Sequence, residues 1–177
     1  MRYNFQKDLI RVWGKAVKLY EQGNRDPSTF PLSEEIEFLN SIGMNLMDAF
    51  DFAEDWVCEG EPDLATFLLI HEQRKDYFWE IQKEIPSQNT MDPATLPAKN
   101  LEIEGVVWLP RIIPKARAKL KGELPSCSMY CCSGDRNFFR TNNIHPAEFL
   151  QIVKRAGNDD QTIVSWVIKR KMKTNEI

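Results

Sequence analysis

Apolar side chains recur at intervals of three and four residues along most of this chain, and that period limits the fold more than any other feature. Such a period is typical of an amphipathic α-helix that packs its apolar face against a core. In the first segment the apolar positions are Phe5, Leu9, Val12, Trp13, Ala16 and Tyr20. Similar patterns predict further helices over residues 34–42, 45–59, 62–84, 110–121, 135–141, 146–156 and 160–173. The predicted fold class is therefore mainly α.

Three predicted helices have recognisable starts. Ser33 is placed to cap the helix over residues 34–42, and Asn45 with Asp48 resembles a capping box. Pro62 is predicted in the first turn of the helix over residues 62–84, where proline is tolerated. These residues set the expected helix boundaries.

The helical pattern is interrupted once, between residues 86 and 104. Three prolines, Pro86, Pro93 and Pro97, indicate a linker or an ordered surface strap. The short run 106–109 that follows is either one strand or the buried start of a helix. The predicted organisation is a first helical repeat over residues 1–85, a strap over 86–105 and a second helical repeat over 106–177.

The two halves resemble each other when the chain is shifted by 100 residues. Residues 9–55 then align with 109–155 without a gap, and after a slip of three residues Gly60 aligns with Gly157. The identical pairs are Leu9/Leu109, Arg11/Arg111, Lys15/Lys115, Ala16/Ala116, Ser28/Ser128, Ser33/Ser133 and Phe38/Phe138. We therefore predict two diverged copies of a roughly four-helix unit, packed as one compact helical protein. The alternative is a chance similarity between helices of like composition.

The charge is divided unequally between the halves. Residues 1–104 hold 10 Lys and Arg against 20 Asp and Glu, a net −10, whereas residues 105–177 hold 13 against 6, a net +7. The two halves could attract one another within the fold, or the basic half could face an acidic partner. The first eight residues lack the apolar core of a secretory signal, and the apolar run 64–70 is too short to span a bilayer. We expect a soluble cytoplasmic protein with no membrane contact.

Four cations at matching positions are the main candidates for a binding site. Arg and Lys lie four residues apart in each half, so both side chains share one face of a helix and need an anionic neighbour. The cations are Arg11, Lys15, Arg111 and Lys115, and their candidate carboxylates are Glu35 and Asp135. One interpretation is an ion-pair brace between the first and second helices of each repeat. The other is a pair of anion sites for phosphate or carboxylate ligands.

Three cysteines near one histidine form the only cluster typical of redox or metal chemistry. Cys127, Cys131 and Cys132 lack the paired spacing of structural zinc sites, and His145 is better explained as a helix-start residue. We expect no metal, and the cysteines should be reduced and partly buried. Cys132 is the one candidate nucleophile. No glycine-rich phosphate loop or dinucleotide fingerprint is present, so no cofactor is expected.

The stretch 107–120, VWLPRIIPKARAKL, resembles the bacterial family of domains of unknown function numbered 5069. The resemblance continues through Tyr130, Cys132, Asp135 and Phe138, is strongest over residues 107–170 and is fainter over 9–80. This chain reads Cys-Ser-Gly-Asp at 132–135, where the family pattern is Cys-Pro-Leu-Asp. The resemblance implies a small, soluble bacterial protein and no particular reaction.

Two functions remain open from the sequence. The first is a non-catalytic binding or interaction module, whose partner is an unknown protein or a small anionic ligand. The second is an enzyme or small-molecule sensor in a cleft between the repeats. There Arg111 and Lys115 would hold an anionic group, Asp135 would orient them and Cys132 would be the nucleophile. Nucleic-acid binding by the basic half is a third, weaker hypothesis, which predicts steep salt dependence, and nucleic acid is not the partner we expect.

Overall fold

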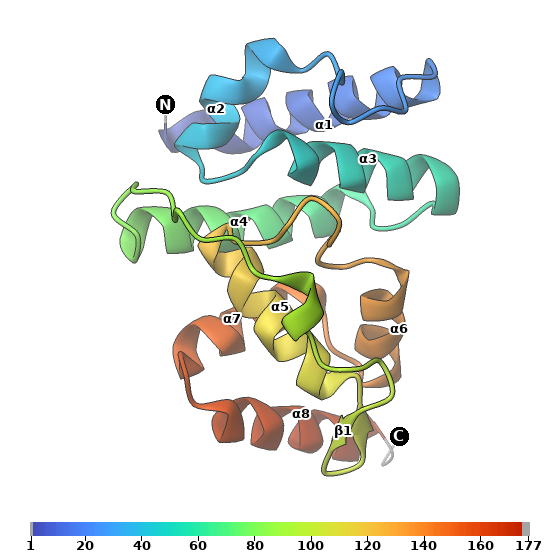
Figure 1. Ribbon diagram of the computed structural model, residues 1–177, viewed down its shortest axis with the longest axis vertical. Coiled ribbons are helices and arrows are strands. Elements are labelled where there is room, and N and C mark those ends of the chain that lie inside the picture. The colour runs from blue at the N-terminus through green and yellow to red at the C-terminus, as the bar shows by residue number, and fades with distance from the viewer. Residues whose placement is uncertain (1, 175–177) are drawn as a thin grey trace. The chain divides into compact units, whose positions relative to one another are not determined.

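The computed structural model describes residues 2–174, and the chain divides into two compact units (Figure 1). Unit 1 comprises Met1–Pro86 and unit 2 comprises Ser87–Ile177. The protein is mainly helical, as the apolar period predicts. None of the helices in the described part of the chain has the length and apolar character needed to cross a bilayer.

Unit 1 contains four α-helices within residues 2–86. They are α1 (Phe5–Glu21), α2 (Ile36–Ser41), α3 (Leu46–Glu59) and α4 (Leu64–Glu80), with short 3-10 helices at Arg2–Asn4 and Ser33–Glu35. Helix α1 packs against α3 and α4. Aromatic side chains fill the space between these helices, and the Trp13 and Phe67 ring centroids lie 4.7 Å apart. The apolar face that the sequence predicts for residues 5–20 is therefore the face that α1 buries.

Unit 2 contains a small hairpin followed by four α-helices within the described residues. The hairpin pairs β1 (Glu102–Ile103) with β2 (Val106–Val107) in antiparallel register. The helices are α5 (Leu109–Lys121), α6 (Ser133–Thr141), α7 (Pro146–Ala156) and α8 (Asp160–Thr174). Helix α5 packs against α7 and α8. The run 106–109 is predicted to be either a strand or the start of a helix, and it contains both. Its first two residues form β2, and Leu109 begins α5.

The proline-rich segment is an ordered strap along unit 2. The Ser87 hydroxyl donates to Glu123 Oε1 over 2.6 Å, and the Met91 amide donates to the Glu123 carbonyl over 2.8 Å. Further along, the Pro97 carbonyl accepts from Arg111 Nη1 at 2.8 Å. These contacts fix the strap to α5 and to Glu123, which follows the end of that helix.

The segments that follow the first helix begin at corresponding positions in the two units, whereas α1 begins at Phe5 and α5 only at Leu109. The turn and helix over 33–41 match α6 at 133–141, and α3 and α7 begin at 46 and 146. The last helices match at a shift of 96, because Asp63 accepts from the Thr66 amide at 2.8 Å and Asp159 accepts from the Thr162 amide at 3.1 Å. Positions in the two units can therefore be compared at a shift of 100, or 96 in α4 and α8.

Of the three helix starts predicted in unit 1 from Ser33, Asn45 and Pro62, one is confirmed and two are wrong. Asn45 and Asp48 form a capping box, with each side chain 3.0 Å from the other residue's amide nitrogen. Ser33 lies inside a 3-10 turn and makes no side-chain cap. Pro62 precedes the cap rather than entering the first turn, because the Asp63 side chain already accepts from the Thr66 amide.

The predicted end of α4 is also wrong. The helix ends at Glu80 rather than at Glu84. Lys83 and Glu84 have φ angles of 53° and 65°, in the left-handed region that interrupts a right-handed helix.

Gly43, in the turn after α2, should tolerate alanine poorly. Its φ is +71°, and an added Cβ would lie 2.6 Å from Phe78 Cγ on α4. Gly23, with φ +97° and open space around it, is the matched control. We expect Gly23→Ala to cost about 1 kcal/mol for the backbone conformation alone. Gly43→Ala should cost about 3 kcal/mol, because overpacking adds to the same strain. Urea unfolding of the full chain measures both, and equal losses would contradict this packing.

Candidate functional site

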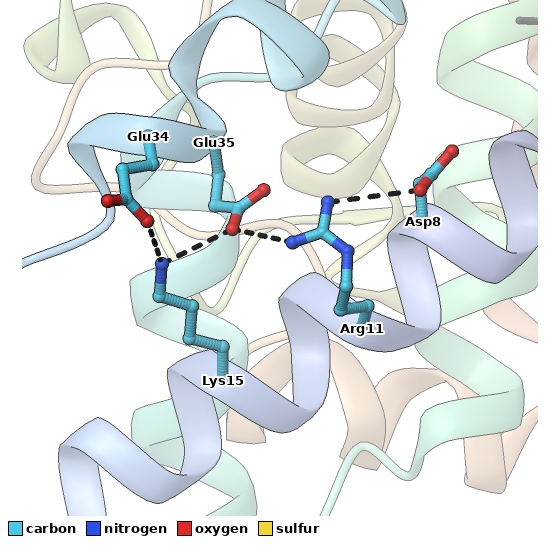
Figure 2. Close-up of polar contacts among 5 residues, drawn as sticks. All are labelled: Asp8, Arg11, Lys15, Glu34 and Glu35. Atoms are coloured by element: carbon cyan, nitrogen blue, oxygen red, sulfur yellow. Dashed lines mark hydrogen bonds and ion pairs between the residues drawn. The ribbon is translucent and has the colours of Figure 1, made fainter.

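In unit 1 the two predicted cations lie between three carboxylates (Figure 2). Lys15 Nζ lies 3.2 Å from Glu34 Oε2 and 3.3 Å from Glu35 Oε1. Arg11 Nη1 donates to the same Glu35 oxygen over 2.6 Å, and its Nη2 lies 3.8 Å from Asp8 Oδ1. Both cations of α1 therefore converge on Glu35, which stands just before α2.

The environment of Glu35 keeps it ionised. Its side chain is 6% exposed, whereas that of Arg11 is 54% exposed. The hydrogen bond from Arg11 lowers the pKa of the Glu35 carboxyl, against the opposing effect of burial. The hydrogen bond to Glu35 in turn raises the pKa of Arg11, and that to Glu34 raises the pKa of Lys15. The group is an ion-pair brace between α1 and the start of α2, half open to solvent.

In unit 2 the corresponding pair is buried. Lys115 Nζ lies 2.6 Å from Asp135 Oδ2, and their side chains are 5% and 0% exposed. The same oxygen accepts from the Cys131 amide at 2.9 Å, and Oδ1 accepts from Trp108 Nε1 at 3.0 Å. Lys115 Nζ also lies 3.2 Å from Cys132 Sγ. The carboxylate is therefore bound on both oxygens, as a buried charge requires.

Arg111 does not join this cluster. Its Nη1 donates to the Pro97 carbonyl on the strap, and its guanidinium carbon lies 5.7 Å from the Trp108 ring centroid. Arg11 donates to the Glu35 oxygen that Lys15 also contacts, whereas Trp108 donates to the Asp135 oxygen that Lys115 does not contact. Of the four residues grouped by the sequence hypothesis, the structure brings Lys115, Asp135 and Cys132 together.

Trp108 is a site residue that the sequence reasoning missed. It stands at the N-cap position of α5 with φ +74°, and its indole ring packs over Gly134 in the first turn of α6. A Cβ at Gly134 would lie 2.7 Å from the ring atoms Cη2 and Cζ2. The sequence feature that could have indicated this contact is Gly134, where the chain departs from the family pattern. Glycine within a helix indicates that another group packs closely against the backbone.

A pocket of about 290 Å³ opens beside Trp108 in unit 2. It lies between the hairpin, α6 and the C-terminal part of α8, which Figure 1 draws beside the hairpin. Gly105, Val107 and Trp108 line it from the hairpin side, Asn137, Phe138 and Thr141 from α6, and Lys171 from α8. We call this the Trp108 pocket. No sequence pattern indicated it, because its walls come from three separate segments.

The three cysteines of unit 2 differ in burial, so the prediction that they are partly buried holds for two of them. Cys131 is buried, Cys132 is partly exposed and Cys127 is exposed, all as free thiols. His145 is confirmed as a helix-start residue, since its Nδ1 accepts from the Ala147 amide at 3.2 Å. Over the described residues 2–174, no three His, Cys, Asp or Glu side chains are grouped to hold a metal ion.

The fold and site define unit 2 as a helical domain with a hairpin-bounded pocket. Residues 95–176 match the family described as Domain of unknown function (DUF5069), which confirms the resemblance drawn over 107–170. The match contains Trp108, Lys115, Asp135 and the pocket. No curated protein and no solved structure matches the chain. The fainter resemblance over residues 9–80 stays a prediction.

The two braces should differ in strength because one is buried and the other is not. Asp135→Ala should lower the free energy of unfolding by about 3–5 kcal/mol, since it leaves the Lys115 charge buried and unpaired. Glu35→Ala at the matching position should cost about 1 kcal/mol, because its cations can turn to solvent. Urea unfolding followed by circular dichroism measures both. Equal losses would contradict the difference in burial.

Proposed function

We propose that this protein is a non-catalytic ligand-binding module and that unit 2 binds a small molecule in the Trp108 pocket. The observation that carries the proposal is the lining of that pocket. An indole and a valine supply apolar surface, while Asn137, Thr141 and Lys171 supply an amide, a hydroxyl and an ammonium group. Apolar walls with a few convergent polar groups are typical of small-molecule sites.

We propose further that the two units are diverged copies of one four-helix unit. The corresponding helix starts and the matching pairs Lys15–Glu35 and Lys115–Asp135 support this. Both pairs join the first long helix of a unit to the next helix. This supports their interpretation as structural braces rather than as anion sites. In this account the ligand enters beside the second brace, not in place of it.

A bacterial cytoplasmic location is part of the same proposal. The free thiols Cys58, Cys127, Cys131 and Cys132 support a reducing compartment. Residues 95–176 match the family whose resemblance implies a bacterial protein, and this match supports the bacterial origin.

Blocking the pocket should abolish binding without unfolding the chain. A fragment library screened by protein-observed NMR should give ligands that shift the Trp108 indole N–H signal and the amides of Asn137 and Thr141. Asn137→Trp places a large side chain at an exposed lining position and should remove those shifts. Gln151→Trp, at an exposed position on α7 outside the lining, is the matched control and should leave them unchanged. If no fragment shifts the pocket signals, the proposed function is wrong.

A second candidate is a thiol-based sensor, and one contact favours it. Lys115 Nζ lies 3.2 Å from Cys132 Sγ, and a nearby ammonium group is a recurrent feature of reactive cysteines. Limited alkylation with iodoacetamide, read by mass spectrometry, should then modify Cys132 faster than the more exposed Cys58 and Cys127. Lys115→Met should remove that advantage. Modification in order of exposure alone would rule the sensor out.

A further inference from the structure

Unit 1 holds a cluster of aromatic rings around Lys75, which corresponds at the shift of 96 to Lys171 of the Trp108 pocket. Trp79 on α4 donates its indole N–H to the Ser41 carbonyl at the end of α2, over 2.8 Å. Its ring stands edge-on to Phe5, the first residue of α1, with the centroids 6.2 Å apart. Lys75 Nζ lies 3.9 Å from the Phe5 ring centroid and 4.9 Å from the Trp79 ring. Two rings, one ammonium group and one carbonyl thus form a closed cluster.

The corresponding positions of unit 2 line the pocket. Lys171 stands twelve residues after Asp159, as Lys75 stands twelve after Asp63. Thr141 ends α6 as Ser41 ends α2. The ammonium group and the helix end are therefore present in both units, and Lys171 and Thr141 both line the pocket.

Neither ring has an aromatic residue at the corresponding position of the unit 2 sequence. At the shift of 100 Gly105, between β1 and β2, corresponds to Phe5, and α5 begins only at Leu109. The position of Trp79 corresponds to residue 175, an asparagine outside the described residues. Among the described residues of unit 2, the aromatic part of the cluster is thus replaced by a pocket of about 290 Å³.

The carboxylates around the lysine are also replaced. Lys75 Nζ lies 3.0 Å from Asp76 Oδ1 and 3.8 Å from Glu72 Oε1. The corresponding residues of α8 are Met172 and Ile168, which carry no charge. Lys171 Nζ donates a 3.3 Å hydrogen bond to the Gly105 carbonyl on the pocket wall. An ammonium group placed there can donate a charge-assisted hydrogen bond to the carboxylate of a ligand.

We propose that the Trp108 pocket binds a small aromatic carboxylate with a ring N–H, such as an indole carboxylate. This rests on the proposed function and names the ligand class for the same site. The ring takes the place of the Phe5 and Trp79 rings, its N–H donates to the Thr141 carbonyl, and its carboxylate pairs with Lys171. Cation–π attraction and a charge-assisted hydrogen bond then act on one ligand. The volume of about 290 Å³ restricts the ligand to one or two rings.

Three matched probes test the ligand class on the full-length protein. Indole-3-carboxylate carries both the ring and the charge, indole-3-carboxamide lacks the charge, and cyclohexanecarboxylate lacks the aromatic ring. NMR titration of the pocket signals should give indole-3-carboxylate a dissociation constant on the order of 0.1–1 mM. The carboxamide and cyclohexanecarboxylate should each bind about tenfold more weakly.

Lys171→Met should weaken indole-3-carboxylate binding about tenfold and carboxamide binding only about threefold, since the amide loses only the cation–π contact. Lys169→Met, at an exposed position on the same helix outside the pocket, is the matched control and should change neither. If other fragments bind the pocket but these probes show no preference, the ligand class is wrong and the proposed function stands. If no probe and no fragment shifts the pocket signals, both are wrong.

Discussion

The buried pair of Lys115 and Asp135 is the interaction on which the architecture of unit 2 depends. A carboxylate with no solvent exposure must be bound on each oxygen, and Asp135 achieves this with contacts from α5, from the Cys131 amide and from Trp108. These contacts join the start of α6 to α5 and to the end of the hairpin. They also fix the indole that forms one wall of the pocket. The buried charge of Asp135 thus fixes the position of Trp108, which lines the proposed binding pocket.

Both units contain an ion pair between the first long helix and the start of the next, and the two pairs differ in solvent exposure. In unit 1 the pair Lys15–Glu35 is shared with Arg11 and lies half open to solvent. In unit 2 Asp135 binds Lys115 and the Cys131 amide through one oxygen and the Trp108 indole through the other, and the pair is enclosed. The tryptophan contact therefore links the buried pair to one wall of the pocket. At the other end, unit 1 has the Phe5–Trp79 ring pair, and unit 2 has the hairpin that lines the Trp108 pocket.

Features encoded by neighbouring residues could be predicted from the sequence. The apolar period gave the helices, and Asn45 with Asp48 gave a capping box because its two partners are three residues apart. The carboxylates of Glu35 and Asp135 were predicted from the need of two like charges for an anionic neighbour. Trp108 and Lys171 could not be predicted, since their roles depend on the hairpin, α6 and α8 meeting. The strand β1 was missed because two residues carry no periodic signal.

The central claim is that unit 2 leaves open, for a ligand, the space that unit 1 closes with its own rings. A crystal structure of the full-length protein with indole-3-carboxylate tests it most directly, through superposition of the two units. Ligand density is expected between Trp108, Thr141 and Lys171, with the ligand ring falling on the superposed rings of Phe5 and Trp79. A pocket filled by the chain's own side chains, or units that do not superpose, would contradict it.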